Sequence, residues 1–487
     1  MKRLMTASIA LTTGLSSLLA VPVHHASAAS CPSSGADYGE MFPNLPDASW
    51  DPTDLRELSV AMIAPADEPP VTGATDPEDN GAIPAGYTYF GQFLDHDLTL
   101  DDRPDDLTTP TDPSSLVNGR TPRLDLDSLY GGGPTSSPQL YASDHVHLLV
   151  GDPLSGSSDR GARDLPRDAN GQALIGDPRN DENRIVAGIH SLFIRYHNKV
   201  VDRILQRRPG WSDAVVFARA RREVVAAYQW IVLTDYLPRI VGQRNMDAVI
   251  HRRGSRWSTS LPVDTTCAQM PVEFSAAAYR FGHSQVRAFY RLNAGTGPLP
   301  VFSGTFAVGS DLTGFSPSPS TFAIDWNLFV PTRTRSAQSS YKIDGSLTHS
   351  LSLLPLPTTG IGPANLALRN LLRGQQLGLP SGQDVARAMG VTPLPDDQIL
   401  IGAATGDPSD QRSITEISSA FAGSAPLWVY VLAEAGRNPS GRLGPVGGRL
   451  VAETVVGLLA SDPTSIVARS GAKPQVTSLW TLVTAVR

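Results

Sequence analysis

The chain has 487 residues, of which 41% are hydrophobic and 18% charged, so it can bury a sizeable core and is neither fibrous nor broadly disordered. Its net charge of −7 argues against nucleic acid as a partner. The length alone allows about three domains, but the residues that carry chemistry lie between positions 92 and 370 and need one shared pocket. We therefore expect one large domain.

The first 28 residues have the pattern of a secretory signal peptide. Lys2 and Arg3 precede an apolar stretch that ends at Ala20, and an Ala-Ser-Ala triplet at 26–28 offers a cleavage site. Polar residues interrupt the apolar stretch well short of the roughly 20 residues that a membrane span needs, and no later segment qualifies. We expect a secreted protein that is cleaved after Ala28 and has no transmembrane segment.

The remaining chain divides into an arm and a main domain. Residues 29–80 are rich in Pro, Asp, Ser and Gly and show little periodicity, which predicts an extended amino-terminal arm over residues 29–84. The main domain then covers residues 85–487. Cys31 and Cys267 are the two cysteines; export permits a disulfide between them, and two unpaired thiols fit equally well.

Helical patterns dominate the main domain. Apolar residues recur at helical spacing from Tyr87 to Leu98. A second helical run covers residues 174–204, where Asp177 can cap the helix and Pro178 suits its first position. Further helices are expected at residues 213–241, 273–291, 362–373, 426–436 and 447–460. Strand patterns are few and short, so we predict a mainly α fold, with a single large helical domain and few short strands.

The first segment that could carry chemistry is the helix at residues 89–97. Helical spacing places Gln92 and His96 on one face, with Asp95 beside them. A capped surface helix with a solvated histidine would give the same local pattern.

The second segment follows Gly176. Arg179 and Glu182 lie one helical turn apart and could form an exposed ion pair, which contributes little to stability. His190 and His197 are seven residues apart and share a helix face. Two hydrogen-bonded packing histidines explain this pair better than a metal site does.

The third segment, at residues 274–283, places small residues before a histidine. Gly282 removes a side chain next to His283, which allows a flat ligand to approach, and Arg280 falls on the same helix face as His283. A buried structural histidine is the alternative interpretation.

Taken together, the three segments resemble the animal-type haem peroxidase superfamily. Residues 91–98, 176–198 and 274–283 are similar to its distal, arginine-bearing and proximal signatures, in the same order, and further similarity runs through residues 370–380. The resemblance covers roughly residues 85–460. It implies a helical haem peroxidase domain and leaves the amino-terminal arm unexplained.

The resemblance implies a role for each residue. It assigns His96 as the distal base, Arg179 as its partner, His283 as the proximal iron ligand and Asn370 as the hydrogen-bond partner of His283. A neutral imidazole can take a proton from peroxide and return it, and a fixed guanidinium stabilises developing charge. Gln92 would hold water or an anion in the distal cavity, and Arg280 would meet a haem propionate.

Two carboxylates imply covalent attachment of haem b. Asp95 and Glu182 occupy the positions at which mammalian members of the family form ester bonds to haem methyl groups. Asn183 stands where one mammalian member has a methionine that forms a third link, so a sulfonium bond at this site is excluded.

A calcium site is also implied. Asp97 together with Thr121, Arg123, Asp125 and Asp127 resembles the calcium site of the family. Carboxylates, a hydroxyl and backbone carbonyls are the ligands that a hard cation prefers. Because Asp97 directly follows His96, the ion would hold the distal helix in place. A polar turn is the local alternative.

The partners implied are hydrogen peroxide and a small reducing substrate: halide, thiocyanate, phenol and other aromatic donors all remain open, as does the oligomeric state. One alternative within the superfamily is a fatty-acid dioxygenase, in which a tyrosine lies three residues before the proximal histidine; here that position is Arg280, and Tyr279 points about 100° away around a helix. A secreted haem- or calcium-binding protein without activity is the second alternative.

Overall fold

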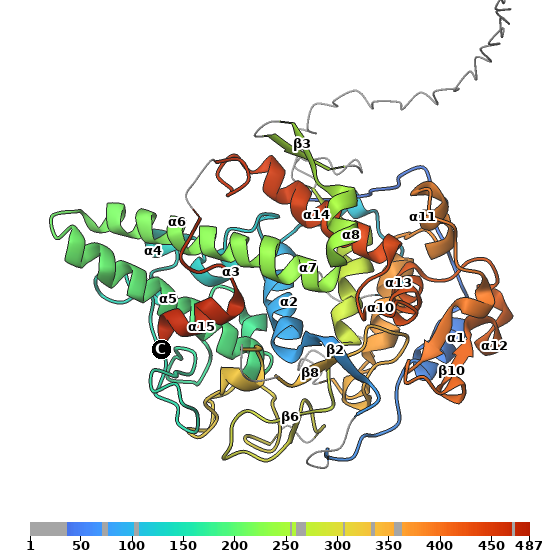
Figure 1. Cartoon of the computed structure of the whole chain (residues 1–487), viewed down its shortest axis with the longest axis horizontal. Helices are drawn as coiled ribbons and strands as arrows, with labels where there is room; N and C mark the ends of the chain where they lie inside the picture. The colour runs from blue at the N-terminus through green and yellow to red at the C-terminus, as the bar shows by residue number, and fades with distance from the viewer. Residues whose placement is uncertain are drawn as a thin grey trace, which may run out of the picture. The chain divides into compact units, whose positions relative to one another are not determined.

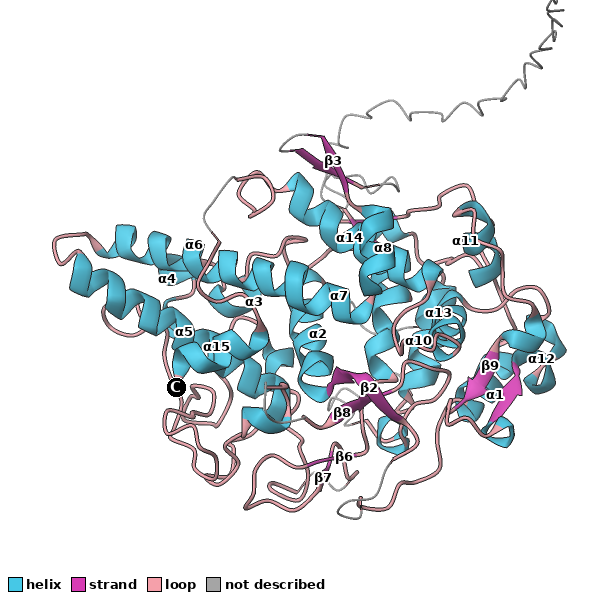
Figure 2. Cartoon of the chain, viewed as in Figure 1, coloured by secondary structure: helices cyan, strands magenta, loops and turns pink. Residues whose placement is uncertain are grey.

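Helices dominate the chain, as the sequence predicts (Figure 2). The computed structural model describes residues 37–70, 76–101, 107–253, 256–259, 269–304, 307–332, 337–354, 363–469 and 473–487. The predicted signal peptide and both cysteines lie outside the described residues. None of the described helices combines the length and the apolarity needed to cross a membrane.

Fifteen α-helices lie in the described residues. They are α1 (Pro52–Ala61), α2 (Ala85–Leu98), α3 (Asp127–Tyr130), α4 (Gly133–Ser136), α5 (Arg184–Arg207), α6 (Asp213–Ile231), α7 (Leu237–Ile240), α8 (Gly242–Val249), α9 (Val272–Ser275), α10 (Leu366–Gln376), α11 (Gly382–Ala388), α12 (Ile414–Ile417), α13 (Leu427–Gly436), α14 (Pro445–Ser461) and α15 (Leu479–Val486). Two short 3-10 helices, η3 (Pro178–Asp181) and η5 (Ala278–His283), carry several of the predicted site residues.

The strands described are short and form two-stranded pairs. Strand β1 (Tyr38–Gly39) runs parallel to β5 (Met270–Pro271). The other pairs are antiparallel: β2 (Asp79–Pro84) with β8 (Ser339–Tyr341), β3 (His251–Arg253) with β4 (Arg256–Ser258), β6 (Phe289–Tyr290) with β7 (Leu299–Pro300), and β9 (Leu400–Gly402) with β10 (Gln411–Ser413).

Helix α2 lies in the middle of the fold (Figure 1) and packs against α5, η3 and η5. Its large side chains, including Phe90, Phe93 and Leu94, are fully buried, so it is enclosed on several sides rather than amphipathic at a surface. Gly91 permits a close approach, because a Cβ atom there would lie 2.5 Å from the hydroxyl of Tyr236. The first predicted site residues therefore come from a helix that is almost entirely buried.

The helical run predicted at residues 174–204 is divided in two. Asp177 caps η3 by accepting a hydrogen bond from the Arg179 backbone N–H at 2.9 Å. The long helix α5 starts only after Asn183, whose side chain accepts from the N–H groups of Ile185 and Val186. The capping prediction at Asp177 is confirmed, and the break at Asn183 was not predicted.

The continuous helix predicted at residues 273–291 is wrong. The segment contains the four-residue α9, then η5, then strand β6. In a 3-10 helix, residues three apart lie directly above each other, so Arg280 and His283 still share a face. The contacts of η5 with α2, α13 and α14 override the local helix propensity of this segment.

The predicted arm is not extended throughout. Residues 52–61 form α1, which Asp51 caps by accepting from the Thr53 N–H at 2.8 Å. Leu55 and Leu58 are fully buried, and α1 packs against α10 and α12, which lie far along the chain (Figure 1). The division into an arm and a main domain at residue 84 stays a prediction.

The end of η3 is held by a glycine in a distant loop. The backbone N–H of Gly314 donates to the Glu182 carbonyl at 2.9 Å, and that of Phe315 donates to the Asp181 carbonyl at 2.8 Å. A Cβ atom at Gly314 would lie 1.6 Å from the Asp181 carbonyl oxygen. The chain can approach η3 this closely only without a side chain.

Gly314→Ala is therefore expected to lower the free energy of unfolding by at least about 2 kcal/mol, since backbone must move to relieve the overlap. Gly297→Ala is the matched control, because a Cβ atom there would meet nothing within 4 Å. Thermal unfolding followed by circular dichroism compares the two. Equal unfolding midpoints would contradict the close packing at Gly314.

Candidate active site

A cavity of about 340 Å³ lies beside α2, within the size range of small-molecule sites, about 300–1,000 Å³. Six residues predicted from the sequence line it: Gln92, Asp95, His96, Glu182, Arg280 and His283. They come from α2, the end of η3, and η5. The structure thus brings together residues that are up to 191 positions apart in the chain.

His96 is buried, with 5% of its surface exposed. Its Nδ1 atom lies 3.0 Å from Oδ1 of Asn180. Burial, and then the positive charge of Arg179, lower the pKa of His96 to about 3. The imidazole is therefore neutral near pH 7, as a proton acceptor must be.

Arg179 does not belong to the described lining of this cavity. Its guanidinium instead donates to the buried carboxylate of Asp177 at 2.7 Å and to the Thr99 carbonyl at 2.6 Å. Burial would raise the pKa of Asp177, but the hydrogen bonds and the charge of Arg179 outweigh it and hold the pKa below its usual value. Arg179 thus ties η3 to the end of α2, and its charge acts on His96 from there.

Gln92 is fixed by two neighbours. Its Nε2 atom donates to Glu182 at 3.0 Å, and its Oε1 atom accepts from the side-chain amide of Asn183 at 3.0 Å. Asn183, which also lines the cavity, thereby joins the start of α5 to α2. The side-chain amide of Gln92 has one N–H left for a ligand.

Two carboxylic acids face the cavity. Burial raises the pKa of Asp95, against the opposing charges of Arg179 and Arg280. Burial also raises the pKa of Glu182, against Arg179 and Arg369. Both groups therefore hold a proton more readily than exposed carboxylates do.

Across the cavity, His283 and Arg280 share one partner. Asn370 donates from Nδ2 to His283 Nδ1 at 2.8 Å and accepts at Oδ1 from Arg280 at 2.6 Å. Burial, and then the charge of Arg280, lower the pKa of His283 to about 3. Burial, and then the neighbouring Arg373, lower the pKa of Arg280 to about 10.

Sequence reasoning missed several lining residues. Arg369 and Arg373 line the cavity from α10, and their spacing from Asn370 on a helix could have revealed them. Tyr236 and Tyr279 also line it, joined by a hydrogen bond of 2.9 Å between their hydroxyl oxygens. The inference that Tyr279 points away from Arg280 holds for an α-helix, yet both residues reach this cavity.

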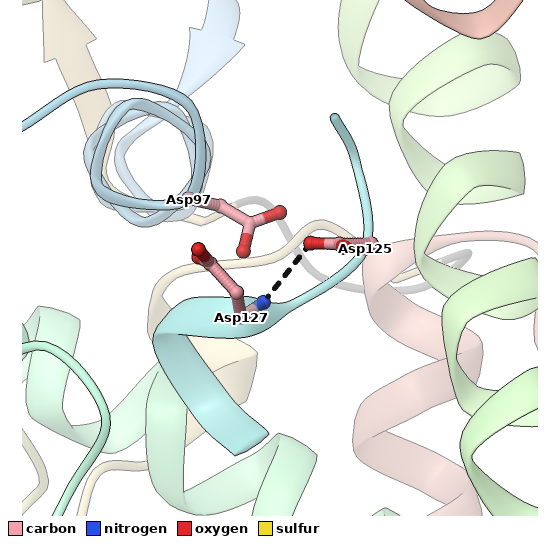
Figure 3. A group of neighbouring side chains, drawn as sticks. All are labelled: Asp97, Asp125 and Asp127. Carbon is pink, nitrogen blue, oxygen red and sulfur yellow. Dashed lines mark hydrogen bonds between the residues drawn. The ribbon is translucent and has the colours of Figure 1, made fainter. Parts of the chain in front are cut away.

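A cluster of three carboxylates includes Asp97, the residue that follows His96 in the chain. One oxygen atom from each of Asp97, Asp125 and Asp127 can lie within 4.8 Å of the others (Figure 3). Asp97 is fully buried, and burial, followed by the charges of the other two, raises its pKa well above the usual value. Leu126, at φ 59°, adopts the left-handed conformation between the two loop carboxylates, which is rare for a branched residue.

Thr121 belongs to the same cluster. Its hydroxyl donates to Asp125 at 2.8 Å and its backbone N–H donates to Asp127 at 2.8 Å. Arg123 is exposed, and its backbone N–H donates to the Thr121 carbonyl at 2.7 Å. The structure therefore brings together the carboxylates and the hydroxyl of the predicted calcium site, while the Arg123 side chain stays at the surface.

Comparison with known proteins places these features in a family. Residues 102–462 match the model of the animal haem peroxidase family; the match begins after α2 and includes Arg179, His283 and Asn370. Peroxinectin A of Dictyostelium discoideum is 26% identical over 266 residues, which are 52% of this chain and 44% of the relative. Mouse thyroid peroxidase is 24% identical over 376 residues, or 72% of this chain and 38% of the relative. The chain thus spans less than half the length of these relatives.

Solved structures share the fold. Peroxidase A from Dictyostelium discoideum aligns with a TM-score of 0.59 and 20% identity, covering 93% of this chain and 92% of that one. A fatty acid α-dioxygenase from Arabidopsis thaliana aligns with a TM-score of 0.58 and 16% identity, covering 91% and 74%. Because the family model matches most of the sequence, this chain belongs to the animal haem peroxidase family.

Proposed function

We propose that this protein is a secreted peroxidase, which reduces hydrogen peroxide and oxidises a small anion or aromatic donor. The observation that carries the proposal is a single cavity with His96 from α2 and His283 from η5, each fixed at Nδ1 by an asparagine. Absorption spectra of the purified protein, before and after hydrogen peroxide, test it. A Soret band that responds to peroxide supports the proposal; a Soret band without any reaction would leave a haem-binding protein.

The donor set of the cavity fits haem b. His283 offers a neutral imidazole as iron ligand. Three guanidinium groups, from Arg280, Arg369 and Arg373, line the same cavity and suit the carboxylates of a propionate-bearing ring. A Cβ atom at Gly282 would meet nothing within 4 Å, so the wall beside His283 is open to a flat group.

His283 would hold the iron through Nε2, which leaves its proton on Nδ1. Asn370 then serves as the acceptor once its amide oxygen turns toward the ring, an exchange of two atoms of nearly equal size. Arg280, which donates to that oxygen in this structure, would turn to a propionate.

When bound, haem supplies the two electrons that reduce hydrogen peroxide to water. His96 takes a proton from one peroxide oxygen and returns it to the departing oxygen, so no free hydroxide forms. The positive charge of Arg179, which acts from outside the described cavity lining, stabilises the negative charge that builds on the peroxide oxygens during this transfer. Gln92 uses its remaining N–H to hold water or an anion in the cavity.

We further propose that Asp95 and Glu182 bind haem covalently as esters. For each ester, one carboxylate oxygen would bond to one ring methyl carbon, which loses one hydrogen as a proton. The two electrons released by each ester bond reduce one hydrogen peroxide to two waters.

Because both carboxylates face the cavity, we expect haem to stay with the protein after turnover with peroxide and extraction in acidified organic solvent. Asp95→Asn with Glu182→Gln should release it. Free extraction from the unaltered protein would contradict the ester links and leave the peroxidase proposal standing.

A fatty-acid dioxygenase is the second candidate, because Tyr279 lines the same cavity as His283. Arg280 occupies the position three residues before His283, which favours the peroxidase. Oxygen uptake with a long-chain fatty acid, absent any peroxide-dependent oxidation of iodide or a phenol, would favour the dioxygenase.

A further inference from the structure

Asn180 lies at the centre of η3 and is fully buried. The four consecutive residues at positions 179–182 each bind a different partner. Arg179 binds Asp177, Asp181 binds Arg167 and Glu182 accepts from Gln92. Asn180 is the one of these four residues whose side chain pairs with the imidazole ring of His96, whereas Arg179 reaches only the backbone carbonyl of His96, at 3.3 Å.

Asn180 bridges two buried histidines. Its Oδ1 atom lies 3.0 Å from His96 Nδ1 in α2, and its Nδ2 atom lies 3.1 Å from His190 Nδ1 in α5. An amide oxygen only accepts and an amide nitrogen only donates. In this arrangement His96 must carry its proton on Nδ1, and His190 must accept at Nδ1.

The hydrogen bond to Asn180 fixes which ring nitrogen of His96 has a free lone pair. Hydrogen bonding at one ring nitrogen sets the protonation of the other. Nε2 of His96 has no hydrogen-bond partner among the described residues, and in this tautomer it is unprotonated. In the opposite tautomer Nε2 would carry a proton. It would then face hydrogen peroxide as an N–H group and could not accept a proton from it.

His190 gives a second reason to assign a purpose to the bridge. It is fully buried, and its Nε2 atom has no partner within the part of the chain that the structure describes. Burying a polar group without a partner costs about 1–3 kcal/mol, so a phenylalanine of similar size would suit packing against Phe93 at 5.9 Å better. A histidine offers what phenylalanine lacks: a ring nitrogen that pairs with the Asn180 amide at 3.1 Å and, when it accepts, holds that amide in the orientation observed.

We propose that Asn180 is a positioning residue for proton transfer: it locks His96 in the tautomer whose Nε2 lone pair faces the cavity, and His190 locks Asn180. The proposal rests on the proposed function, in which His96 is the base. A purely structural crosslink between α2, η3 and α5 would make the same contacts, so the test must read the tautomer itself.

The first measurement is ¹⁵N NMR of histidine-labelled full-length protein loaded with zinc protoporphyrin, which is diamagnetic. His96→Gln identifies the signals of His96 by their loss. We expect a protonated, pyrrole-type Nδ1 and an unprotonated, pyridine-type Nε2. A protonated Nε2 in the unaltered protein overturns the proposal.

The second measurement is the rate constant for the haem-loaded protein with hydrogen peroxide in stopped flow. Asn180→Ala frees His96 to take either tautomer, and we expect the rate to fall about 10- to 100-fold, part of the usual contribution of acid–base catalysis. Asn180→Asp keeps an acceptor for His96 Nδ1 and should recover most of that loss. His190→Phe should slow the reaction less than Asn180→Ala does.

Asn198 provides a matched control. Its side-chain amide also makes two hydrogen bonds, to the backbone N–H and carbonyl of Leu148, both at 2.9 Å, and it lies outside the cavity lining. Asn198→Ala should lower the unfolding temperature and leave the peroxide rate unchanged. If Asn180→Ala behaves in the same way, Asn180 is a crosslink and the proposal fails.

These outcomes separate the proposal from the function on which it rests. If His96→Gln leaves the peroxide rate unchanged, the proposed role of His96 fails. If His96→Gln slows the reaction but Asn180→Ala changes neither rate nor tautomer, the positioning role alone fails.

Discussion

His96→Ala should leave haem bound and slow the reaction with hydrogen peroxide by at least about 100-fold, the usual scale of acid–base catalysis. The reason is that His96 is the neutral imidazole supplied by α2 to the cavity, and alanine can neither take nor return a proton. Stopped-flow absorption at the Soret band measures the rate. Unchanged kinetics in a variant with a normal Soret band would exclude His96 as the base.

Two further histidine variants serve as comparisons for that result. His283→Ala should lose the cofactor or alter its Soret band, since His96 and His283 are the histidines in the described cavity lining. His197→Ala should lower stability alone, because His197 is buried against Tyr130 and the Val146 carbonyl, outside the lining. A shifted Soret band in His197→Ala, with none in His283→Ala, would reverse the assignment.

Two helices near the carboxyl end could be predicted closely. Residues 426–436 and 447–460 were expected to be helical, and α13 and α14 occupy Leu427–Gly436 and Pro445–Ser461. The helix α1 was missed, although its start was visible: Asp51 is a capping residue and Pro52 suits the first helical position. Leu55 and Leu58 then give the buried stripe.

The segment around His283 could not be predicted from local sequence. Ala276, Ala277 and Ala278 favour a helix by propensity, yet a regular α-helix does not form. Arg280 and His283 both contact Asn370, which is about 90 positions away, and a 3-10 turn aligns two residues three apart. The deciding contacts are long-range.

The candidate site was predicted better than the elements that carry it. Gln92, His96 and His283 share one cavity as expected, because residue type and order indicated the site even where the helix around His283 was wrong. The side-chain direction of Arg179 was not predictable, since it depends on Asp177 and the Thr99 carbonyl. Asn180 carries no signal in the sequence at all; only the approach of α2 and α5 reveals it.

We propose that Asp97, Asp125 and Asp127 bind calcium, and that its removal changes stability and chemistry together. Without an ion, Asp97, Asp125 and Asp127 hold three carboxylate groups close together (Figure 3), and Asp97 is fully buried. Repulsion then acts on the residue covalently next to His96. An ion that binds only the folded state stabilises it by about 3 kcal/mol when its concentration is a hundred times Kd, and that stabilisation is lost on removal.

We therefore expect chelation, or Asp125→Ala, to lower the unfolding temperature, perturb the Soret spectrum and slow the peroxide reaction. Asp247→Ala removes an exposed carboxylate outside the cluster and should change none of the three. A lower unfolding temperature with an unaltered spectrum would mean that the ion stabilises the fold without acting on His96. Exhaustive chelation, verified by metal analysis, that changes neither stability nor spectrum would mean that residues 121–127 form a polar turn and bind no calcium.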